Sequence, residues 1–149
     1  HYSLLNRDLL LTGVLLHDIG KVQELRWETG FEYTTEGVLL GHIHMGVTLV
    51  EKTIDTLPNF PPRLKTMVIH LILSHHGKLE FGSPKLPMTP EALALSFVDD
   101  LDAKMQAVLN EFEKSAREGR APDALTGKVW SLDQRQMLDT RGWLAELEK

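Results

Sequence analysis

The sequence contains no cysteine, which excludes disulfide bonds and thiolate metal ligands. Any metal ion must therefore be held by nitrogen and oxygen atoms, which suits a hard or borderline divalent ion. The sequence also lacks both a signal-peptide pattern at its start and an apolar run of the roughly 18 residues that a membrane span needs. We therefore expect a cytoplasmic protein with no membrane partner.

Positive charge is scarce as well, because 16 Lys and Arg stand against 21 Asp and Glu, for a net charge of −5. This balance argues against a broad, nonspecific nucleic-acid surface, which normally carries a basic excess. It leaves room for a nucleic-acid enzyme, since acidic metal ligands count in the total and a catalytic groove needs only a local positive patch. The length of 149 residues fits a single domain over 1–149.

Four short motifs carry side chains that bind metals. An apolar run ends in His17-Asp18, and Gly41-His42-Ile43-His44, Ser74-His75-His76-Gly77 and Val98-Asp99-Asp100-Leu101-Asp102 follow it along the chain. Divalent metal sites in hydrolases need imidazoles and ionised carboxylates that converge on one point, and one carboxylate can bridge two ions. The motifs therefore predict a metal centre.

Apolar spacing places most of these motifs on helices, which predicts an all-α fold. Asn6 can cap a helix that stops at Gly20, with His17 and Asp18 at its C-terminal end. A short hairpin or irregular loop is expected over 27–34, between the helices that carry the first metal ligands. Three further helices are expected: one from Glu36 to about Leu57 with His42 in its middle, one from the prolines before Leu64 to the histidine pair, and one from Pro90 to near Arg117. A polar linker over 119–128 follows. A helical extension over about 129–149 is then expected to begin at a capping box at Ser131.

The order of the motifs resembles the HD-domain superfamily of metal-dependent phosphohydrolases. Three segments resemble, more narrowly, the HD domain of the YhaM-type 3′-to-5′ exoribonucleases: HDIGK at 17–21, LSHHGKLEFGSP at 73–84, and 92–105, which ends in LDAKM. The similarity covers about residues 4–110. It implies a helical HD bundle that hydrolyses phosphodiesters and removes nucleotides from the 3′ end of RNA with a metal-activated hydroxide.

The resemblance also implies roles for individual residues. Asp18 would be catalytic and would bridge two ions, with His17 and Asp99 on one of them and His42 and His75 on the other. His76 is either a ligand or a phosphate contact, and Asp102 would orient a ligand histidine from outside the ligand set. Mn is the favoured metal, while the donor set also admits Mg, Fe, Co, Zn or Ni. Four lysines are expected to contact substrate phosphate, although each is equally explained as an ordinary surface charge: Lys21, which we also count as catalytic, Lys78, Lys85 and Lys104.

The sequence departs from the HD pattern at one position. HD domains carry a further ligand histidine some 25 to 35 residues upstream of the HD pair, whereas the only upstream histidine here is His1. Two alternatives follow: the same site acting on a nucleotide or cyclic nucleotide, or a catalytically incomplete HD module that binds nucleotides. The partner is expected to be single-stranded RNA or a nucleotide, and a homo-oligomer is left open.

Overall fold

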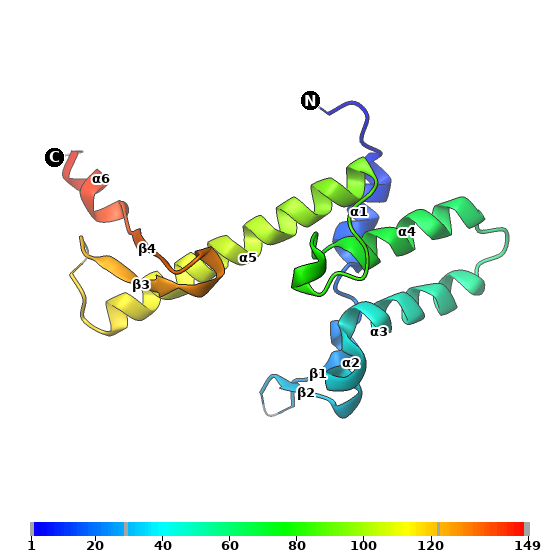
Figure 1. Cartoon of the computed structure of the whole chain (residues 1–149), viewed down its shortest axis with the longest axis horizontal. Coiled ribbons are helices and arrows are strands. Elements are labelled where there is room, and N and C mark those ends of the chain that lie inside the picture. The colour runs from blue at the N-terminus through cyan, green and yellow to red at the C-terminus, as the bar shows by residue number, and fades with distance from the viewer. Residues whose placement is uncertain (1, 29, 122, 148–149) are drawn as a thin grey trace. The chain divides into compact units, whose positions relative to one another are not determined.

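The computed structural model describes residues 2–28, 30–121 and 123–147, so His1 lies outside the described residues. Two compact units divide the chain, His1–Asp99 and Asp100–Lys149. Helices dominate the described residues and the strands form only two small two-stranded sheets, which confirms the predicted all-α class. The elements, labelled in Figure 1, are α1 (Arg7–Leu16), α2 (Lys21–Glu24), β1 (Leu25–Arg26), β2 (Glu32–Tyr33), α3 (Thr35–Asp55), α4 (Pro62–Ser74), α5 (Pro90–Arg117), β3 (Leu125–Val129), β4 (Arg135–Leu138) and α6 (Arg141–Leu147), with short 3-10 helices at Leu79–Phe81 and Trp130–Leu132.

The first helix begins as predicted and ends earlier than predicted. The Asn6 side chain accepts a hydrogen bond from the Leu9 N–H, which caps α1. The helix ends at Leu16, and a tight turn over 17–20 connects it to α2. His17 and Asp18 therefore lie in a turn between two helices, where neighbouring residues are freer to point into one site than they are within a helix.

A hairpin follows α2, as the sequence predicted. Leu25 pairs with Tyr33 and Arg26 pairs with Glu32 in antiparallel register. The Thr34 side chain then caps α3 by accepting a hydrogen bond from the Gly37 N–H.

The third helix is broken at a glycine, which the sequence did not predict. Gly41 has φ 72° and ψ 155°, a backbone conformation outside the helical region that glycine adopts readily. His42 therefore begins the second segment of α3 and does not lie in the middle of a continuous helix. The break lies between Val38 and His42, so these two residues do not have the continuous helical spacing that would put them on one face.

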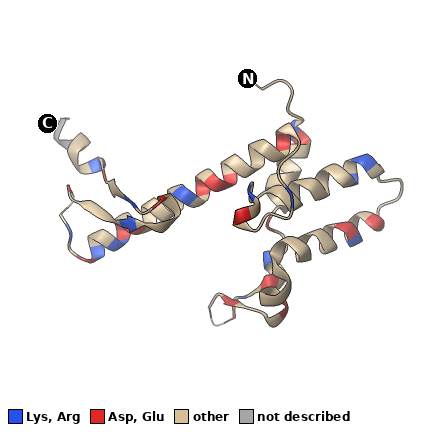
Figure 2. Ribbon diagram, viewed as in Figure 1, with Lys and Arg blue, Asp and Glu red and all other residues tan. Residues whose placement is uncertain are grey.

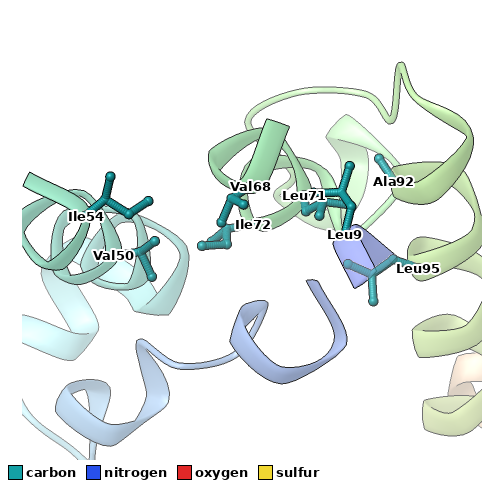
Figure 3. Packing of buried hydrophobic residues seen from close by; sticks show 8 residues of the cluster. All are labelled: Leu9, Val50, Ile54, Val68, Leu71, Ile72, Ala92 and Leu95. Carbon is teal, nitrogen blue, oxygen red and sulfur yellow. The ribbon is translucent and has the colours of Figure 1, made fainter. Parts of the chain in front are cut away.

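The core of the first unit joins α1, α3, α4 and the start of α5. Leu71, Ile72 and Ala92 are completely buried, and Figure 3 shows the side chains of this core between their helices. The Asn6 N–H donates a hydrogen bond to the Glu91 carboxylate (2.7 Å), which ties the start of α1 to the first turn of α5. This core packs together the helices that position the four motifs, with His17 just after α1, His75 just after α4, and His42 and Asp99 within α3 and α5.

The second unit contains a hairpin that the sequence did not predict. β3 pairs with β4 in antiparallel register through Leu125 with Leu138 and Val129 with Arg135. The expected helix start at Ser131 is wrong, because a 3-10 turn and β4 occupy that segment and α6 begins only at Arg141. The prediction of one domain over 1–149 stays a prediction.

Acidic and basic residues both occur along α5, as Figure 2 shows. Three of its ion pairs join residues one helical turn apart, and they are Lys104 with Asp100, Lys114 with Glu111, and Arg117 with Glu113. This pattern is typical of a solvated helix. Among the residues the structure describes, we find no helix that is both long enough and apolar enough to span a membrane.

Candidate metal centre

Three histidines direct Nε2 toward Asp18 in the first unit, and a fourth, His76, lies beside two of them. The Nδ1 of His17 is bonded to the Val14 carbonyl (2.9 Å) and that of His75 to the Ile72 carbonyl (2.7 Å). The Nδ1 of His76 is bonded to the Phe81 carbonyl (2.9 Å), and that of His42 lies 3.2 Å from the Glu24 carboxylate. Because a carbonyl oxygen only accepts, Nδ1 is the donor, and the lone pair of Nε2 is left for another partner.

The two carboxylate oxygens of Asp18 face different histidines. Its Oδ1 lies 3.6 Å from His42 Nε2 and 3.8 Å from His75 Nε2. Its Oδ2 lies 3.5 Å from His17 Nε2 and 2.6 Å from Lys21 Nζ. Asp18 thus stands between two groups of donors, as a bridging carboxylate would.

Buried polar atoms at this centre have no hydrogen-bond partner. Asp18 Oδ1, His42 Nε2 and His75 Nε2 are all buried without one, although a buried polar group normally has a partner. Ligand nitrogens of His42, His75 and His76 lie within 4.8 Å of one another, close enough to hold a metal ion. Imidazole nitrogens and a carboxylate oxygen form a donor set that divalent transition metals bind, so these residues fit such an ion. The pair His75-His76, which the sequence left unresolved, contributes both of its members to this cluster.

The second group of donors contains His17 and Asp99. Asp99 Oδ1 lies 3.5 Å from His17 Nε2, so the first turns of α5 bring a carboxylate to the end of α1. Hydrogen bonds to Asp18 and then Asp99 raise the pKa of His17 to about 10, against the opposing effect of burial. Burial raises the pKa of the Asp18 carboxyl, but His17 and Lys21 outweigh it and hold that pKa well below its usual range. In the metal-free protein a proton on His17 therefore takes the place of a cation between two carboxylates.

Glu24 is a residue of this centre that the sequence did not reveal. Its buried carboxylate accepts a hydrogen bond from the His42 backbone N–H (2.9 Å) and contacts His42 Nδ1 (3.2 Å). It thereby fixes both the start of the second segment of α3 and the ring of His42. A carboxylate behind a ligand histidine commonly sets its tautomer and increases its basicity. The sequence signal for it is weak, because the two residues are 18 positions apart on different elements.

Other predicted residues lie outside this cluster of donors or remain untested. Lys78 is exposed and pairs with Glu80 (3.4 Å), and Lys85 lines a separate cavity with His70 and Met88. His44, the second histidine of its motif, is exposed. Asp102 and Lys104 belong to the second unit, so their roles stay predictions.

Replacing Glu24 by alanine is expected to lower metal affinity about 10-fold to 100-fold, the usual cost of losing a partner behind a ligand histidine. Glutamine at this position keeps an acceptor oxygen for the His42 N–H, so Glu24→Gln should lose less affinity than Glu24→Ala. Isothermal titration with Mn measures both, and Glu32→Ala, which removes an exposed carboxylate from β2, is the matched control. Equal affinities in Glu24→Ala and in the wild type would contradict a role for Glu24 in holding His42.

The stability of the metal-free protein is expected to fall on both sides of about pH 6.5. His17 has a folded pKa of about 10 against 6.5 for the ordinary side chain, so its contribution is complete below pH 6.5 and is lost as the pH rises through 10. Burial lowers the pKa of His75 to about 4, so its contribution is present above pH 6.5 and is lost as the pH falls through 4.

Urea unfolding in EDTA at several pH values measures this profile. His17→Asn should flatten the alkaline side, and His75→Asn should flatten the acidic side between pH 4 and 6.5. An alkaline decline that is unchanged in His17→Asn would show that another group causes it.

Comparison with known proteins agrees with this geometry. The family model described as HD domain matches residues 2–104, a span that includes all four histidines and both carboxylates. The chain is 45% identical over 134 residues to the 3′-5′ exoribonuclease YhaM of Bacillus subtilis strain 168, a match covering 90% of this chain and 41% of that protein. It is 43% identical to the protein of the same name from Geobacillus sp. strain WCH70, over 90% of this chain and 40% of that one. The chain thus spans about two fifths of the length of the curated relatives it matches, and no solved structure matches it.

Proposed function

We propose that this chain, which belongs to the HD-domain family, hydrolyses phosphodiester bonds with the help of divalent metal ions. We further propose that it removes nucleotides from the 3′ end of single-stranded RNA. The observation that carries the proposal is a connected cluster in which the Nε2 atoms of His17, His42 and His75 face Asp18, His76 adjoins His42 and His75, and Asp99 adjoins His17. The relatives named as 3′-5′ exoribonucleases support the substrate and the direction. A cytoplasmic location belongs to the same proposal.

We assign the donors to two ions. His42, His75 and His76 would hold one ion together with Asp18 Oδ1, the oxygen that faces His42 and His75. His17, Asp99 and Asp18 Oδ2 would hold the other. Mn is the favoured metal, and Mg, Fe, Co, Zn or Ni would also suit nitrogen and oxygen donors. Divalent ions in such a site make water acidic enough to ionise near neutral pH and stabilise negative charge on phosphate oxygens.

The residues of the chain have distinct roles in this proposal. Asp18 remains ionised at neutral pH, because its pKa lies well below the usual range, so it needs no deprotonation before it binds an ion. Glu24 holds the His42 ring with Nε2 directed toward Asp18. Lys21 lies 2.6 Å from Asp18 Oδ2, which puts its ammonium group within reach of a phosphate at the same carboxylate. Lys78, Lys85 and Lys104 are the other proposed phosphate contacts, and Asp102 the proposed partner of a ligand histidine.

A time course on 5′-labelled single-stranded RNA with added Mn tests the proposal. We expect a ladder of products that shortens from the 3′ end, and we expect EDTA to abolish it. A mononucleotide and a cyclic nucleotide, offered in parallel, test the alternative substrate. Hydrolysis of either compound without any shortening of RNA would contradict the exoribonuclease and favour a nucleotide phosphohydrolase.

A further inference from the structure

We propose that the ring of Phe81 is a stacking platform for the base of the 3′-terminal nucleotide, an inference that rests on the proposed exoribonuclease activity. Phe81 ends the 3-10 turn Leu79–Phe81, directly after the histidine pair. Aromatic rings stack on bases of any identity, which suits an enzyme that must accept each nucleotide in turn.

The backbone of Phe81 is connected to the candidate metal centre by one hydrogen bond. Its carbonyl accepts a hydrogen bond from His76 Nδ1 (2.9 Å), and His76 belongs to the cluster that could hold a metal ion. A single imidazole ring therefore separates the Phe81 carbonyl from the ligand nitrogens. In a nucleotide a single sugar separates the base from the phosphate, so a substrate with its phosphate at the centre would bring its base to the segments next to the cluster, one of which carries Phe81.

The turn that carries Phe81 is fixed from behind. The buried Ser83 hydroxyl lies within hydrogen-bond distance of the Lys85 carbonyl (2.7 Å) and the Leu73 carbonyl (3.1 Å), and these two acceptors share its single proton. The Phe81 and Ser83 N–H groups both donate to the Lys78 carbonyl, at 3.1 and 3.2 Å. The backbone that carries the ring is therefore fixed before a substrate arrives, which reduces the entropy lost on binding.

The ring itself is accessible and electrostatically suited to a base. Phe81 is 51% exposed, although a phenyl group of this size is normally buried. The Lys78 ammonium lies 4.9 Å from the ring centroid, a cation–π contact that also brings a positive charge to the platform. At the neighbouring Gly82 an added Cβ would meet no atom within 4 Å outside its chain neighbours, so the space beside Gly82 is open.

Substitution of Phe81 makes a clean test, because Phe81→Ala removes the ring and keeps the carbonyl that His76 uses. We would measure the first removal from 5′-labelled RNA with Mn in the wild type, Phe81→Ala and Phe81→Tyr. Phe97→Ala, which removes an exposed phenyl group from α5, is the matched control. We expect Phe81→Ala to raise KM about tenfold, with kcat and metal content close to those of the wild type, since one stacked base contributes about a factor of this size. Phe81→Tyr should restore the KM, and Phe97→Ala should leave it unchanged.

RNA with an abasic 3′-terminal nucleotide makes the test specific for stacking. On this substrate the wild type and Phe81→Ala should have the same KM, because there is no base to stack. A loss in Phe81→Ala that persists on the abasic RNA, or a normal KM on intact RNA, would overturn the platform.

A binding measurement separates this inference from the proposed function. We would measure the affinity of the wild type and Phe81→Ala for the same RNAs in EDTA, which removes metal ions and so prevents cleavage. Tighter binding by the wild type than by Phe81→Ala, without any shortening in Mn, would contradict the exoribonuclease and support the platform. Equal affinities of the two proteins for intact RNA would overturn the platform whether or not the RNA is shortened in Mn.

Discussion

Replacing Asp18 by alanine is expected to reduce RNA cleavage at least about 1,000-fold and to remove both metal ions. The physical reason is that its two oxygens face two groups of donors, His42 with His75 on one side and His17 on the other. Losing even one donor that stabilises charge in a transition state costs about 10²–10³ in rate. A variant that loses a bridging carboxylate should lose more.

Metal content by mass spectrometry and initial rates on labelled RNA measure the two parts of this prediction. Asp55→Ala, which removes an exposed carboxylate paired with Lys65, is the control for the loss of a negative charge in the same unit. Circular dichroism reports whether the Asp18 variant is folded. A folded Asp18→Ala protein that retains two ions, or that cleaves RNA at the wild-type rate, would contradict the role given to Asp18.

Replacing Gly20 by alanine adds one methyl group next to the metal centre. Among the glycine-to-alanine substitutions at this centre, we expect it to lower the free energy of unfolding the most. A Cβ at Gly20 would lie 1.9 Å from the His42 carbonyl oxygen and 2.7 Å from the Gly46 nitrogen. Both are backbone atoms, so the turn that carries His17 and Asp18 would have to move away from α3. Overpacking typically costs about 1–3 kcal/mol and occasionally more, and we expect at least about 3 kcal/mol here because no flexible side chain can yield.

Urea unfolding and Mn titration measure the effect of Gly20→Ala on stability and on metal affinity. The control is Gly13→Ala, whose Cβ would meet only side-chain carbons of Leu71 and Leu95, at 2.9 and 3.2 Å. Those side chains can shift, so the cost there should be smaller. If the Gly20→Ala protein is as stable as the wild type, the turn at 17–20 and α3 do not lie this close together in solution.

The parts of the fold that the sequence predicted are those with strong local signals. The cap at Asn6 and the start of α5 at Pro90 follow from single residues with defined preferences, and the structure has both. The hairpin after α2 follows from alternation around a turn. In each case the local sequence, within a few residues of the feature, specifies the structure that forms.

The missed features depend on contacts that the local sequence does not encode. A glycine within a helical pattern is usually tolerated, so nothing near Gly41 distinguishes a break from a continuous helix. β3 and β4 meet across a turn at Asp133 and Gln134, both with positive φ, while the residues Ser131 to Gln134 have the spacing of a capping box. Tertiary pairing overrides that local preference.

The sequence predicted the donor residues of the candidate metal centre more completely than the residue that holds one of them in place. His17, Asp18, His42, His75, His76 and Asp99 follow from motifs and resemblance, and their assignment to two ions stays a proposal. Glu24 could not be predicted, because its importance lies in one hydrogen bond to the backbone and one contact to the ring of His42. Such a partner is visible only once the fold brings α2 against α3.

Anomalous diffraction from a crystal soaked in Mn tests the central claim most directly, since it locates each ion against the carboxylate of Asp18. We predict two peaks, one on the side of Asp18 Oδ1 with His42, His75 and His76, and one on the side of Oδ2 with His17 and Asp99. A single peak at the three histidines, with His17 still bonded to Asp99, would contradict the two-ion centre bridged by Asp18.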